Sequence, residues 1–159
     1  YVLYIPERYE YIKKELNKTT LNPIFVEGYD KNKLSKKLID EQGKSSGKIA
    51  CHMGHLYILD KFLKTNDDYA FILEDDIYFK DEPRQFIQKF NQILLELPKD
   101  WDILYINAHR CEYGGFKAQP ISENILRLDQ GVWWLSGYML SKEGVKKLLK
   151  NMIELKYFD

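Results

Sequence analysis

The stretch YAFILEDD, residues 69–76, decides the fold of this chain. Its first five residues are apolar over the length of a strand, which predicts a central strand covered on both faces. Three carboxylates follow without a break, Glu74, Asp75 and Asp76. Because open α/β sheets bind their ligands outside the carboxyl ends of the strands, these acids are expected to lie at the rim of a binding site.

The sequence on either side of this stretch alternates between strand and helix patterns. The resulting order predicts an α/β fold, a single domain over residues 1–159 with a mostly parallel central sheet and helices on both faces. Residues 107–122 are polar and are expected to form a long loop. Further strands are predicted at residues 1–5, 23–27, 101–106, 125–128 and 133–140. Helices are predicted at residues 7–18, 31–42, 48–64 and 83–97, and after Ser141, with Ser46 as the N-cap of the third.

The composition argues against two classes of partner. Basic and acidic residues balance at 24 each, so the formal net charge of +0 gives no electrostatic basis for binding nucleic acid. No apolar run approaches the roughly 20 residues of a membrane span.

The sequence starts at Tyr1 without a methionine and ends at Asp159, so we expect the natural chain to be longer, with its C-terminus truncated here. Two cysteines leave both the cytoplasm and the lumen of the endoplasmic reticulum open.

The three acids point to a divalent cation. Adjacent carboxylates repel one another, and a cation relieves that repulsion. Oxygen ligands suit Mg²⁺ or Mn²⁺, which bind through one or two carboxylates together with substrate phosphates. Alternate residues of an extended segment share a face, so Glu74 and Asp76 are expected to point together and Asp75 to point the other way. The alternative is three solvated turn residues, which the lack of Gly, Asn or Ser turn chemistry argues against.

A second segment, GKIACHMGH at residues 47–55, precedes the acidic strand. Its glycines permit a close approach of ligand to backbone, and a helix N-terminus favours phosphate. His52 and His55 are three residues apart and lie near one face, but a lone helical histidine is more often structural. The spacing of four potential zinc ligands matches no closed tetrahedral pattern: Cys51, His52, His109 and Cys111.

Together these segments resemble glycosyltransferase family 25, which includes bacterial lipooligosaccharide galactosyltransferases and procollagen galactosyltransferases. The G-E-I-G-C-x-x-S-H, L-E-D-D and W-D-x-L patterns of that family correspond to residues 47–55, 73–76 and 101–104. A late Gly, Tyr, Ser and Leu-Leu motif corresponds to residues 137–149. The resemblance covers nearly the whole chain in the right order. It departs from the family at Lys48, which stands where the family has glutamate.

The resemblance implies a GT-A type nucleotide-sugar-binding fold with a UDP-sugar, UDP-galactose or UDP-glucose, as donor. It implies a Mn²⁺ or Mg²⁺ ion held by Asp76 and Glu74, the counterpart of the D-x-D element. The acceptor would be a hydroxyl of a protein or glycan, such as collagen hydroxylysine or a surface glycan. The implied donor-binding residues are Pro6, Arg8, Glu27, Gly28, Tyr29, Gly47, Lys48, His55, Glu74 and Asp75.

The family is regarded as inverting, which requires a general base for the acceptor hydroxyl, and Asp159 and Asp129 are the candidates. Trp133 and Trp134 would either stack on an acceptor sugar or belong to the core. Two other functions stay open at this point. A two-metal phosphohydrolase needs acids at further strand ends, but Asp102 begins its strand and so lies at the wrong end. A non-catalytic sugar-nucleotide-binding domain would fit the loss of the family glutamate.

Overall fold

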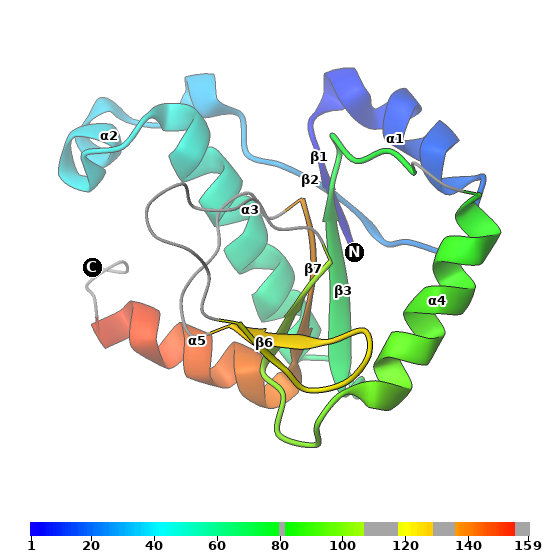
Figure 1. Cartoon of the computed structure of the whole chain (residues 1–159). Helices are drawn as coiled ribbons and strands as arrows, with labels where there is room; N and C mark the ends of the chain where they lie inside the picture. The colour runs from blue at the N-terminus through cyan, green and yellow to red at the C-terminus, as the bar shows by residue number, and fades with distance from the viewer. Residues whose placement is uncertain (80–81, 107–117, 129–135, 155–159) are drawn as a thin grey trace.

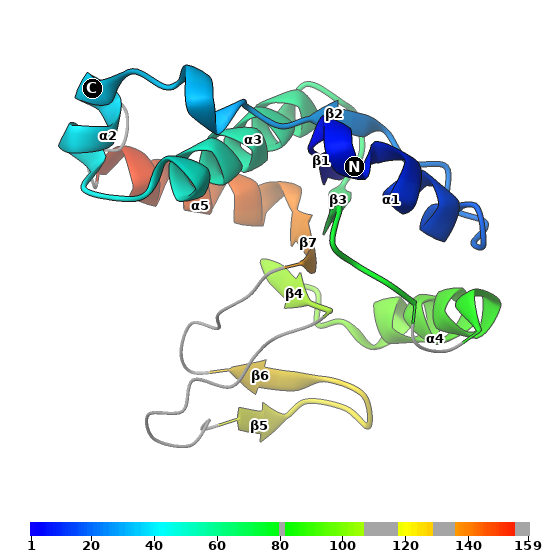
Figure 2. The same cartoon turned by 90° about the horizontal axis from the view of Figure 1, so that it is seen from above.

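The computed structural model describes residues 1–79, 82–106, 118–128 and 136–154. Within these residues a five-stranded sheet forms the centre of the molecule, in the order β2-β1-β3-β7-β4 (Figures 1 and 2). The fold is therefore α/β, as the alternating pattern predicts. The strands are β1 (Val2–Tyr4), β2 (Phe25–Glu27), β3 (Tyr69–Glu74), β4 (Ile103–Tyr105) and β7 (Gly137–Ser141).

The sheet is mixed rather than mostly parallel. β1 pairs in parallel with β2 and β3, whereas β7 is antiparallel to both of its neighbours, β3 and β4. The parallel pairs follow from helical crossovers between their strands. Between β4 and β7 the described residues form a two-stranded hairpin and no helix. No helical crossover therefore requires β7 to be parallel to its neighbours. This hairpin pairs β5 (Ala118–Pro120) with β6 (Leu126–Leu128), and it shows that the predicted loop is wrong at residues 118–120.

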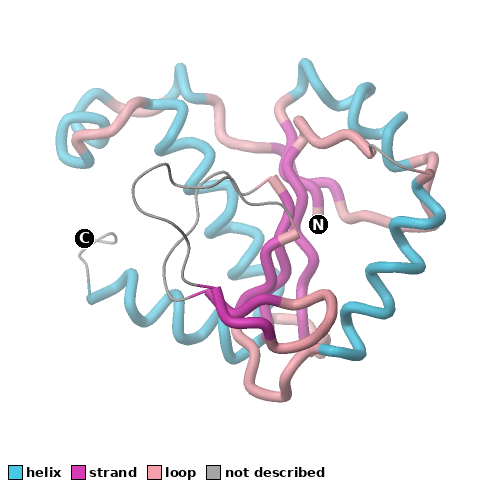
Figure 3. Tube along the Cα trace, in the orientation of Figure 1, coloured by secondary structure: helices cyan, strands magenta, loops and turns pink. Residues whose placement is uncertain are grey.

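Helices cover both faces of the sheet, as predicted (Figure 2). One face carries α3 (Ser46–Leu63) and α5 (Lys142–Glu154), and the other carries α1 (Tyr9–Leu16) and α4 (Pro83–Glu96). Figure 3 shows the same layers along the chain trace. Two core clusters fill the layers. The first contains Leu3, Val26, Ile58, Leu59, Phe62, Ala70, Ile72, Tyr138, Leu140 and Val145. The second contains Val2, Ile12, Leu16 and Leu73.

The lysine-rich segment at residues 31–42 is not the single helix that its pattern predicts. It forms a 3-10 turn, η2 (Lys31–Lys33), and a separate helix, α2 (Lys36–Gln42). The break arises because Ser35 caps α2, with its Oγ accepting the Leu38 N–H at 3.2 Å. Gly43 ends this helix in the left-handed conformation, at φ 58°. The next helix, α3, begins at Ser46 with Ser45 in the N-cap position, so the predicted cap at Ser46 is wrong by one residue.

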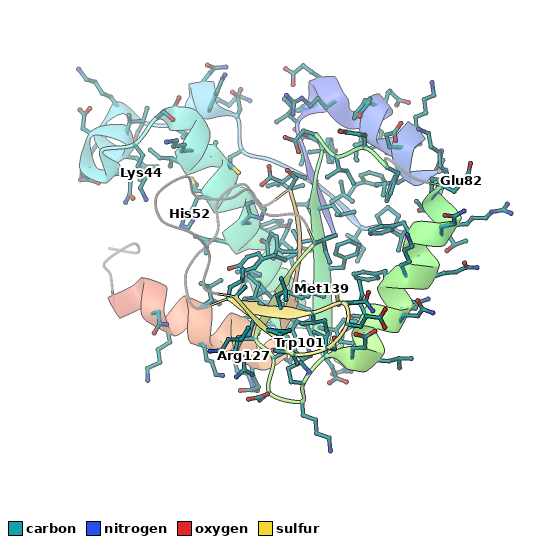
Figure 4. The ribbon with its side chains drawn as sticks, in the orientation of Figure 1. Lys44, His52, Glu82, Trp101, Arg127 and Met139 are labelled. Atoms are coloured by element: carbon teal, nitrogen blue, oxygen red, sulfur yellow. The ribbon has the colours of Figure 1, made fainter. Side chains whose placement is uncertain are left out.

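The far end of the sheet is closely packed around the start of α5. Ser141 caps this helix, because its Oγ accepts the Gly144 N–H at 3.0 Å. A Cβ added to Gly144 would lie 2.2 Å from the carbonyl oxygen of Asp102, so only glycine fits here. Met139 of β7 is fully buried in the middle of the molecule (Figure 4). The sheet and α5 are therefore closely packed at this end, which we call the packed edge. The carboxyl ends of β1, β2 and β3 lie at the opposite end of the sheet, which we call the open edge.

Candidate functional site

The three acids lie where β3 ends, and they differ in exposure. Glu74 is the last residue of β3 and is half-buried, and Asp75 and Asp76 form the turn that follows. Asp75 is 8% exposed, whereas Asp76 is exposed to solvent. Glu74 faces α3, and Asp75 faces the chain after β1 on the other side. The acids thus form an edge at which each carboxylate has a different environment.

Asp75 holds the end of β1 in place. Its Oδ2 accepts the Ile5 N–H at 2.7 Å, and its Oδ1 accepts a hydrogen bond from the Arg8 guanidinium at 3.0 Å. Both carboxylate oxygens are engaged, and the Arg8 side chain is about half exposed at 51%. Arg8 closes η1 (Pro6–Arg8), the 3-10 turn that follows β1. The contacts of Asp75 therefore position two other predicted donor residues, Pro6 and Arg8.

Glu74 belongs to a chain of hydrogen bonds that runs into the core. Its Oε1 lies 3.0 Å from His55 Nε2, and His55 Nδ1 lies 2.8 Å from the Tyr138 hydroxyl. Burial, together with the negative charge of Glu74, raises the pKa of the Tyr138 phenol, which therefore stays protonated. Both hydrogen bonds form when the Tyr138 phenol donates to Nδ1 and the Nε2–H of His55 donates to the Glu74 carboxylate. Glu74 is thus oriented by a buried partner.

Cys51 lies beside the same carboxylate. Its Sγ is 3.9 Å from Glu74 Oε1, one helical turn from His55 on α3. Partial removal of the thiol from water raises the pKa of Cys51 to about 11, and the charges of Glu74, Asp75 and Asp76 act in the same direction. The thiol is accordingly a poor nucleophile at neutral pH. His52, by contrast, projects from α3 away from β3 (Figure 4).

The ends of β1 and β2 meet at the same edge. Tyr4 pairs with Glu27, and the Gly28 N–H donates to the Tyr4 carbonyl at 2.7 Å. A Cβ on Gly28 would lie 3.3 Å from that oxygen, so a small residue suits this turn. An open pocket of about 350 Å³ lies here and contains none of the three acids. Its lining is Phe25, Val26, Glu27, Gly28, Tyr29, Tyr57 and Lys61.

The structure separates the other predicted donor residues along α3. Gly47 and Lys48 lie in the first turn of this helix and are exposed. His55 is seven residues further on than Lys48, which places it roughly 10 Å along the helix axis. The N-terminus of α3 lies at the same edge of the sheet as the end of β3 (Figure 1). His55 therefore contacts the acids directly, whereas Gly47 and Lys48 lie further out along the same edge.

Several predicted residues lie outside the described part of the chain, namely Asp129, Asp159, Trp133, Trp134, His109 and Cys111. In the part that is described, no helix is both long enough and apolar enough to cross a membrane. Cys51 and Tyr138 contact the site, but the sequence reasoning did not assign them to it. The sequence does indicate Cys51, because residues at i and i+4 share a helix face and Cys51 is four residues before His55.

Comparison with known proteins identifies the family. The family model described as "Glycosyltransferase family 25 (LPS biosynthesis protein)" matches residues 5–158. The chain belongs to glycosyltransferase family 25. The resemblance of its motifs to this family is thereby confirmed, and the family assignment makes the chain a glycosyltransferase homologue.

Relatives in glycosyltransferase family 25 are much longer than this chain. A "Glycosyltransferase 25 family member" of Aedes aegypti is 34% identical over 107 residues, which are 66% of this chain and 17% of the relative. "Procollagen galactosyltransferase 2" of Homo sapiens is 26% identical over 140 residues, 86% of this chain and 21% of the relative. An "Inactive glycosyltransferase 25 family member 3" of Mus musculus is 24% identical over 113 residues, 67% of this chain and 18% of the relative. The chain thus spans about a fifth of the length of these relatives.

Proposed function

We propose that this chain is the donor-binding part of a metal-dependent glycosyltransferase with a GT-A type fold. It would transfer a hexose, galactose or glucose, from a UDP-sugar to a hydroxyl acceptor with inversion. Membership of glycosyltransferase family 25 supports the transferase class. The placement of Glu74 and Asp76 at the carboxyl end of β3, where β1 and β2 also end, is the observation that carries the proposal.

The carboxylates at this edge fit a Mn²⁺ or Mg²⁺ ion. Asp76 is exposed and has no hydrogen-bond or ion-pair partner among the described residues. Among the described residues, the side-chain contacts of Glu74 use one oxygen, Oε1, which leaves Oε2 for a further ligand. Hard oxygen donors of this kind suit both ions. When bound, the cation would neutralise charge on the diphosphate leaving group.

The remaining residues of the edge have roles that follow from their placement. In this proposal the turn at Gly28 and the pocket that includes Glu27 and Tyr29 take the uridine, because an aromatic wall suits a base. His55 orients Glu74, and Asp75 orients Arg8. Gly47 and Lys48 would meet the phosphates, where a helix N-terminus and a lysine both favour an anion.

The acceptor is proposed from relatives and not from the site. The human relative is named a procollagen galactosyltransferase, and the family description names lipopolysaccharide biosynthesis. The acceptor is therefore a hydroxyl of collagen-like protein or of a surface glycan. Asp129 and Asp159 stay the proposed candidates for the general base.

A non-catalytic domain is the second candidate function. One relative is named inactive, and Lys48 stands where the family pattern has glutamate. In that case the chain would bind UDP-sugar without turning it over. A phosphohydrolase is disfavoured, because Asp102 lies at the opposite edge of the sheet and is paired with Lys147 at 2.8 Å.

The test is UDP release from UDP-galactose and UDP-glucose with Mn²⁺, with and without a collagen peptide or a glycan acceptor. Chelation of the metal is the control. The proposal expects release that depends on both metal and acceptor. Metal-dependent binding without release would support the non-catalytic domain, and phosphodiester cleavage in the absence of a sugar donor would overturn both.

A further inference from the structure

We propose that Cys51, His55 and Glu74 form a second metal site at this edge, one that takes a thiophilic divalent ion of the Zn²⁺ class. Its donor set of sulfur, nitrogen and oxygen differs from the all-carboxylate set proposed for Mn²⁺. Zinc binding itself rests on no assumption about the reaction, although its consequence for transfer does rest on the proposed function.

The ligand atoms are already gathered. One atom from each side chain, Cys51 Sγ, His55 Nε2 and a Glu74 oxygen, lies within 4.8 Å of the others. Two of the separations are 3.0 Å, between His55 and Glu74, and 3.9 Å, between Cys51 and Glu74. Tetrahedral zinc with Zn–S and Zn–N bonds of about 2.3 and 2.0 Å needs ligand atoms roughly 3.2–3.8 Å apart. Small rotations of these side chains would therefore suffice.

The three side chains come from regular secondary structure, and a buried hydroxyl orients the histidine. Cys51 and His55 share a face of α3, a helix of 18 residues, and Glu74 is the last residue of β3. The buried Tyr138 hydroxyl bonds His55 Nδ1 at 2.8 Å, which leaves Nε2 facing Cys51 and Glu74. A hydrogen bond on the far ring nitrogen is the usual way in which proteins orient a metal-binding imidazole.

The chemistry of the three donors selects the ion. Thiolate and imidazole prefer Zn²⁺ to Mg²⁺ or Mn²⁺. Three protein ligands leave one position for water, and Cys51 is exposed, so an ion reaches the site from solvent. On binding, the Cys51 S–H bond is replaced by a sulfur–zinc bond, and that proton passes to solvent. The imidazole proton moves from Nε2 to Nδ1, which then donates to the Tyr138 oxygen, so Nε2 presents a lone pair to the ion. No change of oxidation state takes place.

The two proposed sites share Glu74. An ion held by Cys51, His55 and Glu74 draws this carboxylate away from the cation beside Asp76. Zinc should therefore inhibit the transfer reaction, and the inhibition should need Cys51. The shared residue makes this a means of regulation at the donor site.

The experiment that tests the site is a titration of the metal-free chain with Cd²⁺, read by the thiolate-to-metal absorption band. The band should appear in the wild type and disappear in Cys51→Ser. His55→Gln removes one of the three ligands and should weaken binding by more than the roughly 10-fold that loss of an outer-shell partner costs. Two matched controls should keep the band, Cys111→Ser at the other cysteine and His52→Gln on the same helix. Far-ultraviolet circular dichroism reports whether each variant is folded.

A band that persists in Cys51→Ser, or that is lost in Cys111→Ser, would overturn the site. If His55→Gln fails to fold, the comparison of Cys51→Ser with Cys111→Ser still decides it. Zinc inhibition of UDP release is then measured in the wild type and in Cys51→Ser, and only the wild type should be inhibited. Cadmium binding without zinc inhibition would keep the site and overturn its link to transfer. Absence of all transfer would count against the proposed function alone.

Discussion

Two acidic positions lie at opposite edges of the same sheet, and they differ in how their charge is balanced. Asp102 precedes β4 and is paired with Lys147, whose Nζ lies 2.8 and 2.9 Å from its two carboxylate oxygens. This hydrogen bond raises the pKa of Lys147. At the other edge, within the described part of the chain, the Glu74 carboxylate contacts a histidine and a thiol but no lysine or arginine, and Asp76 has no ion-pair partner.

This difference in charge balance indicates which acids stabilise the fold and which are available to a ligand. An acid paired with lysine needs no ligand, whereas adjacent carboxylates without lysine gain from a cation. The edge at Asp102 is also closed by close packing, because Gly144 lies against its backbone. The edge at β3 is open and holds a pocket nearby. The contrast supports the proposal that the end of β3 binds the ligand, whereas the start of β4 supports the fold.

The largest effect is expected from removing charge at the open edge. Asp76→Asn and Glu74→Gln should each lower metal-dependent transfer by about 100-fold or more, since metal stabilisation of a leaving group contributes several kcal/mol. Asp102→Asn is the matched control and should change transfer less than about twofold. Initial rates of UDP release measure all three. Equal losses in the three variants would remove the distinction between the two edges.

A large loss of stability is expected at the packed edge. Gly144→Ala places a Cβ 2.2 Å from the Asp102 carbonyl, which is backbone and cannot rotate away. Overpacking of this kind should lower the free energy of unfolding by about 2 kcal/mol or more. At Gly47 in the open edge, no described atom outside its own helical turn lies within 4 Å of an added Cβ, so Gly47→Ala should be neutral or stabilising. Denaturant unfolding compares the two variants.

A smaller loss is expected when a buried acid is neutralised. Asp75→Asn keeps the shape of the side chain but weakens its bonds to Ile5 and Arg8, so it should lower the free energy of unfolding by about 1–3 kcal/mol. Asp102→Asn breaks an exposed pair, which solvent screens, and should lower the free energy of unfolding much less than Asp75→Asn does. The same unfolding assay applies. A larger loss in Asp102→Asn would reverse the roles given to the two acids.

The smallest effect concerns the thiol at the open edge, studied in a Cys111→Ser background. Partial burial and the neighbouring acids raise the pKa of Cys51 to about 11, so the rate of alkylation by iodoacetamide should still rise tenfold per pH unit at pH 9–10. In the denatured chain the alkylation rate should level off near pH 9. At pH 8 the folded rate should be about 10-fold lower, because the smaller thiolate fraction is partly offset by greater nucleophilicity. If the alkylation rate of the folded chain also levels off near pH 9, the acids and the partial burial do not raise the pKa of Cys51 as described.

Patterns confined to one element predicted much of the fold. The central strand at residues 69–73 and the helix cap at Ser141 are correct, because apolar continuity and capping chemistry are local signals. The direction of β7 and the β5–β6 hairpin were missed, since strand pairing depends on residues far apart in sequence. The break before α2 could have been predicted from the sequence, because serine is a favoured N-cap residue and Ser35 caps this helix.

The candidate site was predicted only in part for the same reason. The acidic run and the i, i+4 pair on α3 are local, but their meeting joins residues 23 positions apart, Cys51 and Glu74. Tyr138 approaches His55 from 83 positions away. The engagement of both Asp75 oxygens by the chain after β1 is likewise a tertiary contact. Residue type therefore indicated the chemistry, whereas the partners of each side chain came from the fold.

Calorimetry of UDP binding, with Mn²⁺ and with a chelator, tests the central claim most directly. The account predicts UDP binding that needs the metal in the wild type and in Asp102→Asn, and that is lost in Asp76→Asn. UDP affinity that is unchanged in Asp76→Asn, or equal with and without the metal, would contradict the claim that the acids at the end of β3 hold the cation.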